Sequence, residues 1–340
     1  MTEEHTVQTD PCQSFCDNWK WRLSSKAIWI GLVFLLLVLV LLTAVPVREF
    51  WSPTNLRNLA RTGLLFSALI VPSMILVIAS GGIDLSVGAV AGVVSAVMAS
   101  LMSAGMSPAV ALLIGLLLAI LIGLINGFLV GLARLHGAVV TLGMMVLLRG
   151  IVLVVTDGRA ISAGDVGFLG SLAVPGLLLA LLLIIGVVAL TELAPFARKR
   201  FLGLRDDGPW LQRLAVAGLP YVLTSVMAGF AGACYVGIIG YGTITLGSGL
   251  EAEVMLIVFL GGTVLGGGLV NGLGVILAAL TLAVVKNVWV LSNRPPAEVY
   301  IIEGVGLLVF GLLGQLYYMI VAWIFKRSKA ERTPVVNSHA

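Results

Sequence analysis

Long apolar runs without charge constrain this chain more than any other feature. The segment from Ala27 to Val45 contains no charged residue and is long enough to cross a bilayer as a helix. Comparable runs cover about residues 62–79, 87–104, 107–132, 138–156, 172–191, 214–237, 252–268, 270–291 and 299–323. The sequence therefore predicts an all-α polytopic membrane protein with about ten transmembrane helices, some of them interrupted at glycine-rich points.

The composition excludes several classes of protein. Apolar residues make up 59% of the chain and charged residues 11%, which is about half the charged share of a soluble domain. A soluble enzyme, a disordered chain and a nucleic-acid-binding protein are therefore not expected. The three cysteines, Cys12, Cys16 and Cys234, have no spacing typical of a disulfide framework or a zinc site, so we expect no metal on this chain.

The basic residues predict the orientation in the membrane. If all the runs cross and the N-terminus is cytoplasmic, the cytoplasmic side receives Arg134 and the basic residues of 20–26, 198–213 and 326–332. The opposite side receives only Arg48, Arg57, Arg61, Arg159 and Arg294. Because basic residues resist translocation, both termini are expected in the cytoplasm. The predicted parts are a cytoplasmic tail (1–26), a single transmembrane domain (27–325) and a second cytoplasmic tail (326–340).

One carboxylate lies between two apolar runs, in the segment Ser80-Gly81-Gly82-Ile83-Asp84-Leu85-Ser86-Val87-Gly88. An ionisable group at such a place is costly unless it meets water, a partner or backbone donors. In one interpretation Asp84 caps the helix that begins near Ser86. In the other, Asp84 and Ser86 lie at a broken helix on the path of a transported substrate.

Further polar residues interrupt the next two runs: Asn126, Thr141 and Arg149. Arg149 follows Thr141 by about two helical turns, so both are expected on roughly the same face. Arg149 either forms an ion pair inside the helix bundle or contacts a polar substrate. Near the end of the chain, Lys286 is expected to reach the membrane surface or to pair with Glu303, while Glu251 and Glu253 are expected to begin a helix.

Glycines cluster at Gly81-Gly82, Gly261-Gly262 and Gly266-Gly267-Gly268. Small residues let helices approach closely in a bilayer, whereas a broken helix is tolerated only where its backbone is buried or lines a cavity. Both interpretations stay open for the first pair, and close packing is favoured for the others.

The stretches SGGIDLSVG, GLINGFLV and VVTLGMMVLLRGIVLVVTDGRAIS, followed by YVLTSVMAGFAGACYVG and FLGGTVLGGG, occur in an order and spacing that resemble one family. The chain resembles the permease subunits of bacterial ABC importers for monosaccharides, the ribose, xylose, arabinose and autoinducer-2 group, over about residues 55–315. The resemblance implies a subunit of the bacterial inner membrane that is not an enzyme and carries no cofactor. It also implies a second permease, either identical or different, and a periplasmic solute-binding protein, with ATP and Mg²⁺ held by cytoplasmic ABC ATPase partners.

The chain itself agrees with that division of labour, because it lacks the G-x-x-x-x-G-K-[ST] phosphate loop. In one place it departs from the family. Related permeases have a cytoplasmic segment that docks on the ATPase, and the matching stretch here has lost most of that pattern. Arg205, Asp206, Gly208 and Pro209 are the expected coupling residues, and the alternative is an ordinary basic loop.

Three functions follow from these features. The leading one is the permease subunit of an ABC importer that forms the path of a monosaccharide or sugar-like solute, or else of a branched-chain amino acid or nucleoside. A second is an ion-coupled secondary transporter that uses Asp84 and acts without an ATPase. A membrane-embedded hydrolase is disfavoured, because no paired acid and base, Ser–His pattern or HExxH motif is present.

Overall fold

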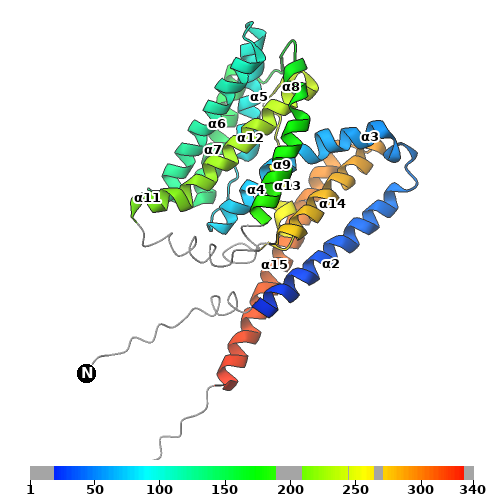
Figure 1. The fold of residues 1–340 in the computed structure, drawn as a ribbon, viewed down its shortest axis with the longest axis vertical. Helices are drawn as coiled ribbons and strands as arrows, with labels where there is room; N and C mark the ends of the chain where they lie inside the picture. The colour runs from blue at the N-terminus through cyan, green and yellow to red at the C-terminus, as the bar shows by residue number, and fades with distance from the viewer. Residues whose placement is uncertain (1–18, 189–208, 244, 264–270, 333–340) are drawn as a thin grey trace, which may run out of the picture.

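The computed structural model describes residues 19–188, 209–243, 245–263 and 271–332, and in these ranges it is almost entirely helical (Figure 1). The helices of the first half are α2 (Trp19–Ala44), α3 (Pro53–Asn58), α4 (Leu65–Ala79), α5 (Val87–Ser103), α6 (Pro108–Gly131), α7 (Gly137–Thr156), α8 (Gly167–Ser171) and α9 (Ala173–Val188). Those of the second half are α11 (Trp210–Arg213), α12 (Leu219–Ile239), α13 (Leu250–Leu260), α14 (Gly272–Leu291) and α15 (Pro296–Arg332). The all-α prediction is confirmed.

Short irregular turns join some of these helices. A 3₁₀ turn, η1 (Arg48–Trp51), precedes α3, and π-helical turns η2 (Leu59–Leu64) and η4 (Leu214–Gly218) lead into α4 and α12. Two short strands, β1 (Ile161–Ser162) and β2 (Tyr241–Gly242), pair antiparallel. This pairing fixes the end of α7 beside the end of α12.

Five helices in the described ranges are long and apolar enough to cross a membrane: Pro108–Gly131, Gly137–Thr156, Trp210–Ile239, Gly272–Leu291 and Ala297–Tyr317. Shorter apolar helices cover Ile28–Ala44, Leu69–Ala79 and Val87–Ser103. The polytopic membrane fold is therefore borne out, while the total of about ten spans stays a prediction. Helix α2 begins before the predicted boundary at 27, and α15 continues beyond 325.

The outer helices present apolar side chains around the bundle. On α6, Leu113, Leu117, Leu121 and Phe128 are all more than half exposed, and Val154 on α7 is 80% exposed. A soluble protein rarely leaves such continuous apolar surface open to water. These faces are suited to contact with lipid or with another membrane subunit.

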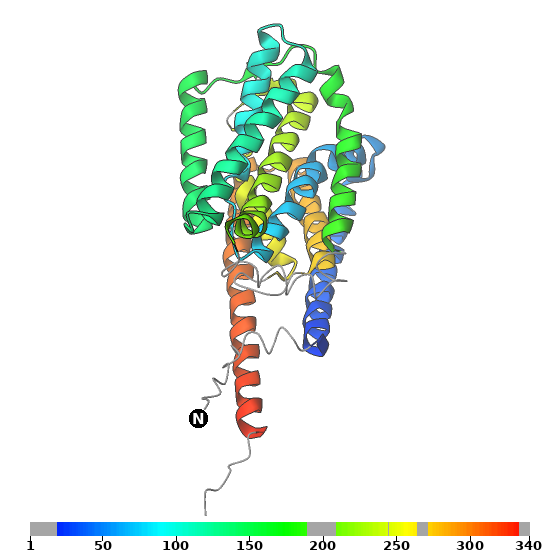
Figure 2. The same cartoon turned by 60° about the vertical axis from the view of Figure 1, so that its left-hand side comes forward.

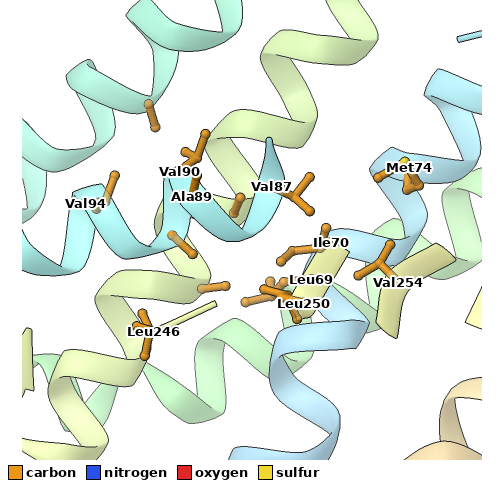
Figure 3. Close-up of a cluster of buried hydrophobic side chains, with 14 of the residues drawn as sticks. Leu69, Ile70, Met74, Val87, Ala89, Val90, Val94, Leu246, Leu250 and Val254 are labelled. Carbon is orange, nitrogen blue, oxygen red and sulfur yellow. The ribbon is translucent and has the colours of Figure 1, made fainter. Parts of the chain in front are cut away.

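Helices α4, α5 and α13 meet in the centre of the molecule. Leu69, Ile70 and Met74 of α4 pack with Val87, Val90 and Val94 of α5 and with Leu250 and Val254 of α13 (Figure 3). Helix α12 crosses this group and also runs along α6, where an added Cβ at Gly123 would lie 2.6 Å from the Val222 Cα atom. Glycine is thus required at the contact of α6 and α12, as expected for close packing in a bilayer.

Helices α2 and α15 extend together beyond the rest of the bundle (Figure 2). Trp29 of α2 meets the ring of Tyr317 of α15 edge to face, with centroids 6.4 Å apart. Trp29 also lies against Gly262, where a Cβ atom would come 2.6 Å from its ring. The first and last long helices therefore both pack near the end of α13.

The expected span at 252–268 is wrong in its extent, because α13 ends at Leu260. Gly262 adopts a φ of +83°, and the N–H groups of Gly262 and Thr263 donate to the carbonyls of Phe259 and Val258. This is a glycine-terminated helix end. Gly261 also packs against Val275, so this pair ends a helix as well as permitting close packing; 264–270 lies outside the described residues.

Candidate functional site

The connection between α4 and α5, residues 80–86, is the most polar part of the described bundle. Gly81 has a φ of +79°, and the N–H groups of Gly81 and Gly82 donate to the carbonyls of Ile78 and Val77, each at 2.9 Å. The backbone therefore leaves the helix at Gly81 by the same motif that ends α13. Both interpretations left open for Gly81-Gly82 therefore apply: Gly81 ends the helix, and Gly82 packs closely against Tyr221.

Asp84 is fully buried and contacts Ser86. Its Oδ1 atom accepts hydrogen bonds from the Ser86 backbone N–H at 2.9 Å and from the Ser86 hydroxyl at 2.6 Å. The side chain thus satisfies the donors of Ser86, the residue that precedes α5, while no described side chain caps the first turn of α5 itself, so the capping interpretation stays a prediction. A role in the substrate path stays a prediction, because Asp84 does not line the cavity described below.

Asn126 and Thr141 join this connection from two other helices. Asn126 of α6 donates from Nδ2 to the Ser86 hydroxyl oxygen at 3.1 Å. Thr141 of α7 accepts from the Leu85 N–H at 3.0 Å and donates to the Ile83 and Gly137 carbonyls. Asp84, Ser86, Asn126 and Thr141, predicted as site residues from separate parts of the sequence, therefore form one buried polar cluster, the 84–86 cluster.

Two buried oxygens of this cluster have no hydrogen-bond partner among the described residues: Asp84 Oδ2 and Asn126 Oδ1. Buried polar atoms are usually paired, so such atoms are unusual inside an apolar bundle. The 84–86 cluster is therefore one of the places in the described bundle where buried oxygens could accept further hydrogen bonds.

Tyr221 of α12 also contacts the connection, and sequence reasoning missed it. The ring is fully buried, and its hydroxyl lies 3.5 Å from the Ile83 carbonyl oxygen. A Cβ atom at Gly82 or at Gly137 would clash with the same hydroxyl. The two glycines therefore make room for the tyrosine ring. In the sequence, a polar aromatic residue near the start of an apolar run could have indicated Tyr221 as a site residue.

Arg149 makes no hydrogen bond to the 84–86 cluster and instead contacts Glu251 of α13. Its Nη2 atom forms an ion pair with Glu251 Oε1 at 2.8 Å, with side chains 29% and 16% exposed. This contact is the structural ion pair considered in the sequence analysis. A Cβ atom at Gly88 would clash with the Glu251 carboxylate, so the pair touches the first turn of α5 and lies next to the 84–86 cluster.

A second ionic group lies on the other side of α13. Lys286 of α14 lies 2.7 Å from Glu253 Oε2 and 3.5 Å from Glu303 Oε1 of α15, and the Ser67 hydroxyl donates to Glu253 Oε1 at 2.9 Å. The predicted pairing of Lys286 with Glu303 is confirmed, as is the start of a helix at Glu251 and Glu253. The sequence analysis missed Glu253 as a partner, although a carboxylate inside the bundle requires one.

The expected coupling residues fall mostly outside the described part of the chain. Arg205, Asp206 and Gly208 lie there, and only Pro209 is described. Pro209 is exposed, immediately precedes α11, and accepts hydrogen bonds from Gln212 and Arg213. The interpretation of this segment as a coupling segment stays a prediction.

No group of three or more His, Cys, Asp or Glu side chains in the described ranges could hold a metal ion. The interior contains hydrogen-bonded polar groups and two ion-pair groups that join α7, α14 and α15 to the short helix α13. Such an interior is suited to a passage or a moving element.

Comparison with known proteins identifies the family. Residues 55–199 match the family described as branched-chain amino acid transport system, permease component. The galactofuranose transporter permease of Escherichia coli is 32% identical over 296 residues, which cover 83% of this chain and 85% of that protein. The chain belongs to the ABC transporter permeases.

Two further relatives extend the match to most of the chain. The L-arabinose ABC transporter permease of Azospirillum brasilense is 29% identical over 87% of this chain and 89% of its own length. The ribose import permease of Bacillus subtilis is 29% identical over 82% of this permease and 90% of its own length. No solved structure matches the chain significantly. The resemblance inferred from the motifs is therefore confirmed over nearly all of the proposed range.

Proposed function

We propose that this permease forms the path by which an ATP-driven importer carries a monosaccharide or sugar-like solute into the cytoplasm. The observation that carries the proposal is that three relatives matching more than four-fifths of the chain bear the names of arabinose, ribose and galactofuranose permeases. The buried hydroxyl, amide and carboxylate groups of the 84–86 cluster are of the types that hydrogen-bond sugars in binding sites.

The partners follow from the same assignment. Two permeases, identical or different, associate with two cytoplasmic ATPases that hold ATP and Mg²⁺, and a periplasmic binding protein delivers the solute. The complex lies in the inner membrane with both termini of this chain in the cytoplasm. The positive-inside distribution supports this orientation, since Arg134 and Arg213 lie together at one end of the bundle.

Reconstitution tests the function. The permease, its ATPase and the binding protein encoded beside it are placed in proteoliposomes, and uptake of labelled arabinose, ribose and galactose is measured with ATP supplied to the ATPase side. We expect uptake of one sugar that is lost with a hydrolysis-deficient ATPase. Uptake by the permease alone, driven by a proton or sodium gradient, would overturn the proposal in favour of a secondary transporter.

A second substrate class has one observation in its favour, because the matching family is described by branched-chain amino acid transport. Labelled leucine is therefore included in the same uptake assay, with a nucleoside as a further competitor. Leucine uptake that sugars do not inhibit would replace the sugar assignment and would leave the importer assignment intact.

A further inference from the structure

A cavity of about 550 Å³ opens at the end of the bundle where the α6–α7 turn meets the start of α11 and α12. Its wall includes Ser80, Gly81 and Gly82 of the α4–α5 connection, and Arg134 and His136 of the turn. Arg213 and Tyr221 complete the opposite side. Nothing in the proposed transport function requires this cavity to be basic.

The cavity is lined by positive charge without a matching negative charge. No carboxylate is found among its lining residues, and within the described ranges neither Arg134 nor Arg213 forms an ion pair. The Nε atom of Arg213 is buried and has no hydrogen-bond partner there. A buried donor without an acceptor is costly, so an anion that reaches the Arg213 Nε atom would satisfy it, and the exposed Arg134 adds a second positive charge beside the same cavity.

The first turn of α7 adds to this attraction. His136 is the N-cap residue of this 20-residue helix and makes no side-chain capping hydrogen bond. Gly137, the first residue of α7, lines the cavity. The positive end of the helix dipole therefore lies beside the same cavity as the arginines, an arrangement that favours phosphate oxygens.

The surroundings of the cavity are those of a membrane interface. Leu135, which lines it, is 50% exposed, and Trp210 and Leu211, which precede Arg213, are 60% and 62% exposed. An exposed tryptophan beside basic residues is typical of the headgroup level of a bilayer. The volume is that of a pocket for an organic ligand and is larger than an inorganic phosphate ion requires.

We propose that this cavity binds the phosphate group of an anionic phospholipid of the cytoplasmic leaflet, with Arg134 and Arg213 as its ligands. Basic pockets between transmembrane helices on the cytoplasmic side are suited to such headgroups. The choice of leaflet rests on the orientation given under the proposed function. Binding itself does not, because the lipid contacts this chain alone.

The first experiment measures lipid binding to the purified permease without ATPase, binding protein or sugar. The permease is placed in phosphatidylcholine nanodiscs, and binding of a fluorescent phosphatidylglycerol is compared for wild type, Arg134→Gln, Arg213→Gln and the double variant. Loss of one basic contact near the headgroup is expected to weaken binding about fivefold, and loss of both about thirtyfold. The matched control is Arg159→Gln, an exposed arginine at the opposite end of α7, which is expected to bind as wild type does.

Conservative variants guard against misfolding. Arg134→Lys with Arg213→Lys keeps both charges and is expected to retain most of the binding, since a phosphate also accepts hydrogen bonds from ammonium groups. Unchanged phosphatidylglycerol binding in the double glutamine variant would overturn the site. Competition by inorganic phosphate together with no preference for phosphatidylglycerol over phosphatidylcholine would overturn the lipid and leave a site for a free anion.

Two further outcomes separate this proposal from the function. If the double glutamine variant binds lipid normally but no longer associates with the ATPase, the arginines serve the partner protein and the proposal fails. The variant Arg134→Cys is then labelled from one side of intact cells with an impermeant maleimide. Labelling from outside would overturn the cytoplasmic leaflet and the orientation together, and a loss of sugar uptake with normal lipid binding would affect only the proposed function.

Discussion

The ammonium group of Lys286 lies 2.7 Å from the carboxylate of Glu253, a residue 33 positions earlier in the chain. Glu303 approaches the same ammonium group at 3.5 Å. Because Glu253, Lys286 and Glu303 belong to α13, α14 and α15, one cation joins the three helices of the C-terminal part. Helix α13 is bounded by non-helical glycines on both sides, so this ionic contact and the packing of α4 hold it in place.

Lys286→Met is expected to destabilise the permease, because it leaves Glu253 and Glu303 buried without a cation. Removing one partner of a buried pair costs about 3–5 kcal/mol. The Lys286 side chain is 35% exposed, so we expect about 2 kcal/mol after solvent screening. The loss is measured as a lower melting temperature of the detergent-purified protein, followed by size-exclusion chromatography after heating.

Neutralising a carboxylate provides the control for Lys286→Met. In the double variant Lys286→Met with Glu303→Gln, one uncompensated charge is removed, and part of the melting temperature is expected to return. Lys286→Arg keeps the cation and is expected to remain near wild type. Equal melting of wild type and Lys286→Met would contradict a structural role for this ion pair.

Asp84→Ala is expected to lower stability by about 1 kcal/mol, since the Ser86 N–H and hydroxyl lose their acceptor at the start of α5. Asp84→Asn keeps a side-chain oxygen in the same place and is expected to retain most of that stability. The measurements are melting temperature and sugar uptake per folded molecule. An alanine variant that melts as wild type does but transports nothing would instead support a role of Asp84 in the substrate path.

Gly137→Ala is expected to destabilise the permease by about 1–3 kcal/mol, because the new methyl group overlaps the hydroxyl of Tyr221. Gly143→Ala lies on the same helix and meets nothing within 4 Å. It is expected to be neutral or slightly stabilising, because alanine favours a helix more than glycine does. Melting temperatures in the opposite order would contradict the close approach of Tyr221 to α7.

The sequence predicted the helical fold well, because an uncharged apolar run indicates the position of a membrane-spanning helix. The ends of α5, α6 and α7 fall within a residue or so of the predicted runs. The helix end at Gly261-Gly262 was not predicted, since a glycine pair permits both close packing and a positive φ, and only the neighbouring backbone decides between them. The same ambiguity stayed open at Gly81-Gly82 until the backbone was seen.

The sequence predicted several residues of the polar cluster, but it did not predict which of them contact one another. Asp84, Asn126 and Thr141 are conspicuous as polar residues in apolar runs, so composition alone identifies them. The contacts of these side chains with Ser86 and Leu85 depend on how α5, α6 and α7 cross. The spacing of apolar residues along the sequence does not predict these crossings. Tyr221 was not predicted because it packs against Gly82 and Gly137. These glycines have no side chain that could indicate a contact in the sequence.

The pair of Arg149 and Glu251 is expected to show energetic coupling in a double-mutant cycle. Arg149→Met and Glu251→Gln each leave one charge with little solvent around it, so each is expected to cost about 1–3 kcal/mol, whereas the combined variant recovers at least about 1 kcal/mol of the sum. The control cycle uses Arg294 and Glu298, which are 3.9 Å apart with side chains 60% and 36% exposed. Exposed pairs of this kind contribute little, so coupling near zero is expected there. Because Glu251 touches the first turn of α5, loss of its partner is also expected to reduce sugar uptake per folded molecule. Purely additive effects on melting would contradict energetic coupling between Arg149 and Glu251.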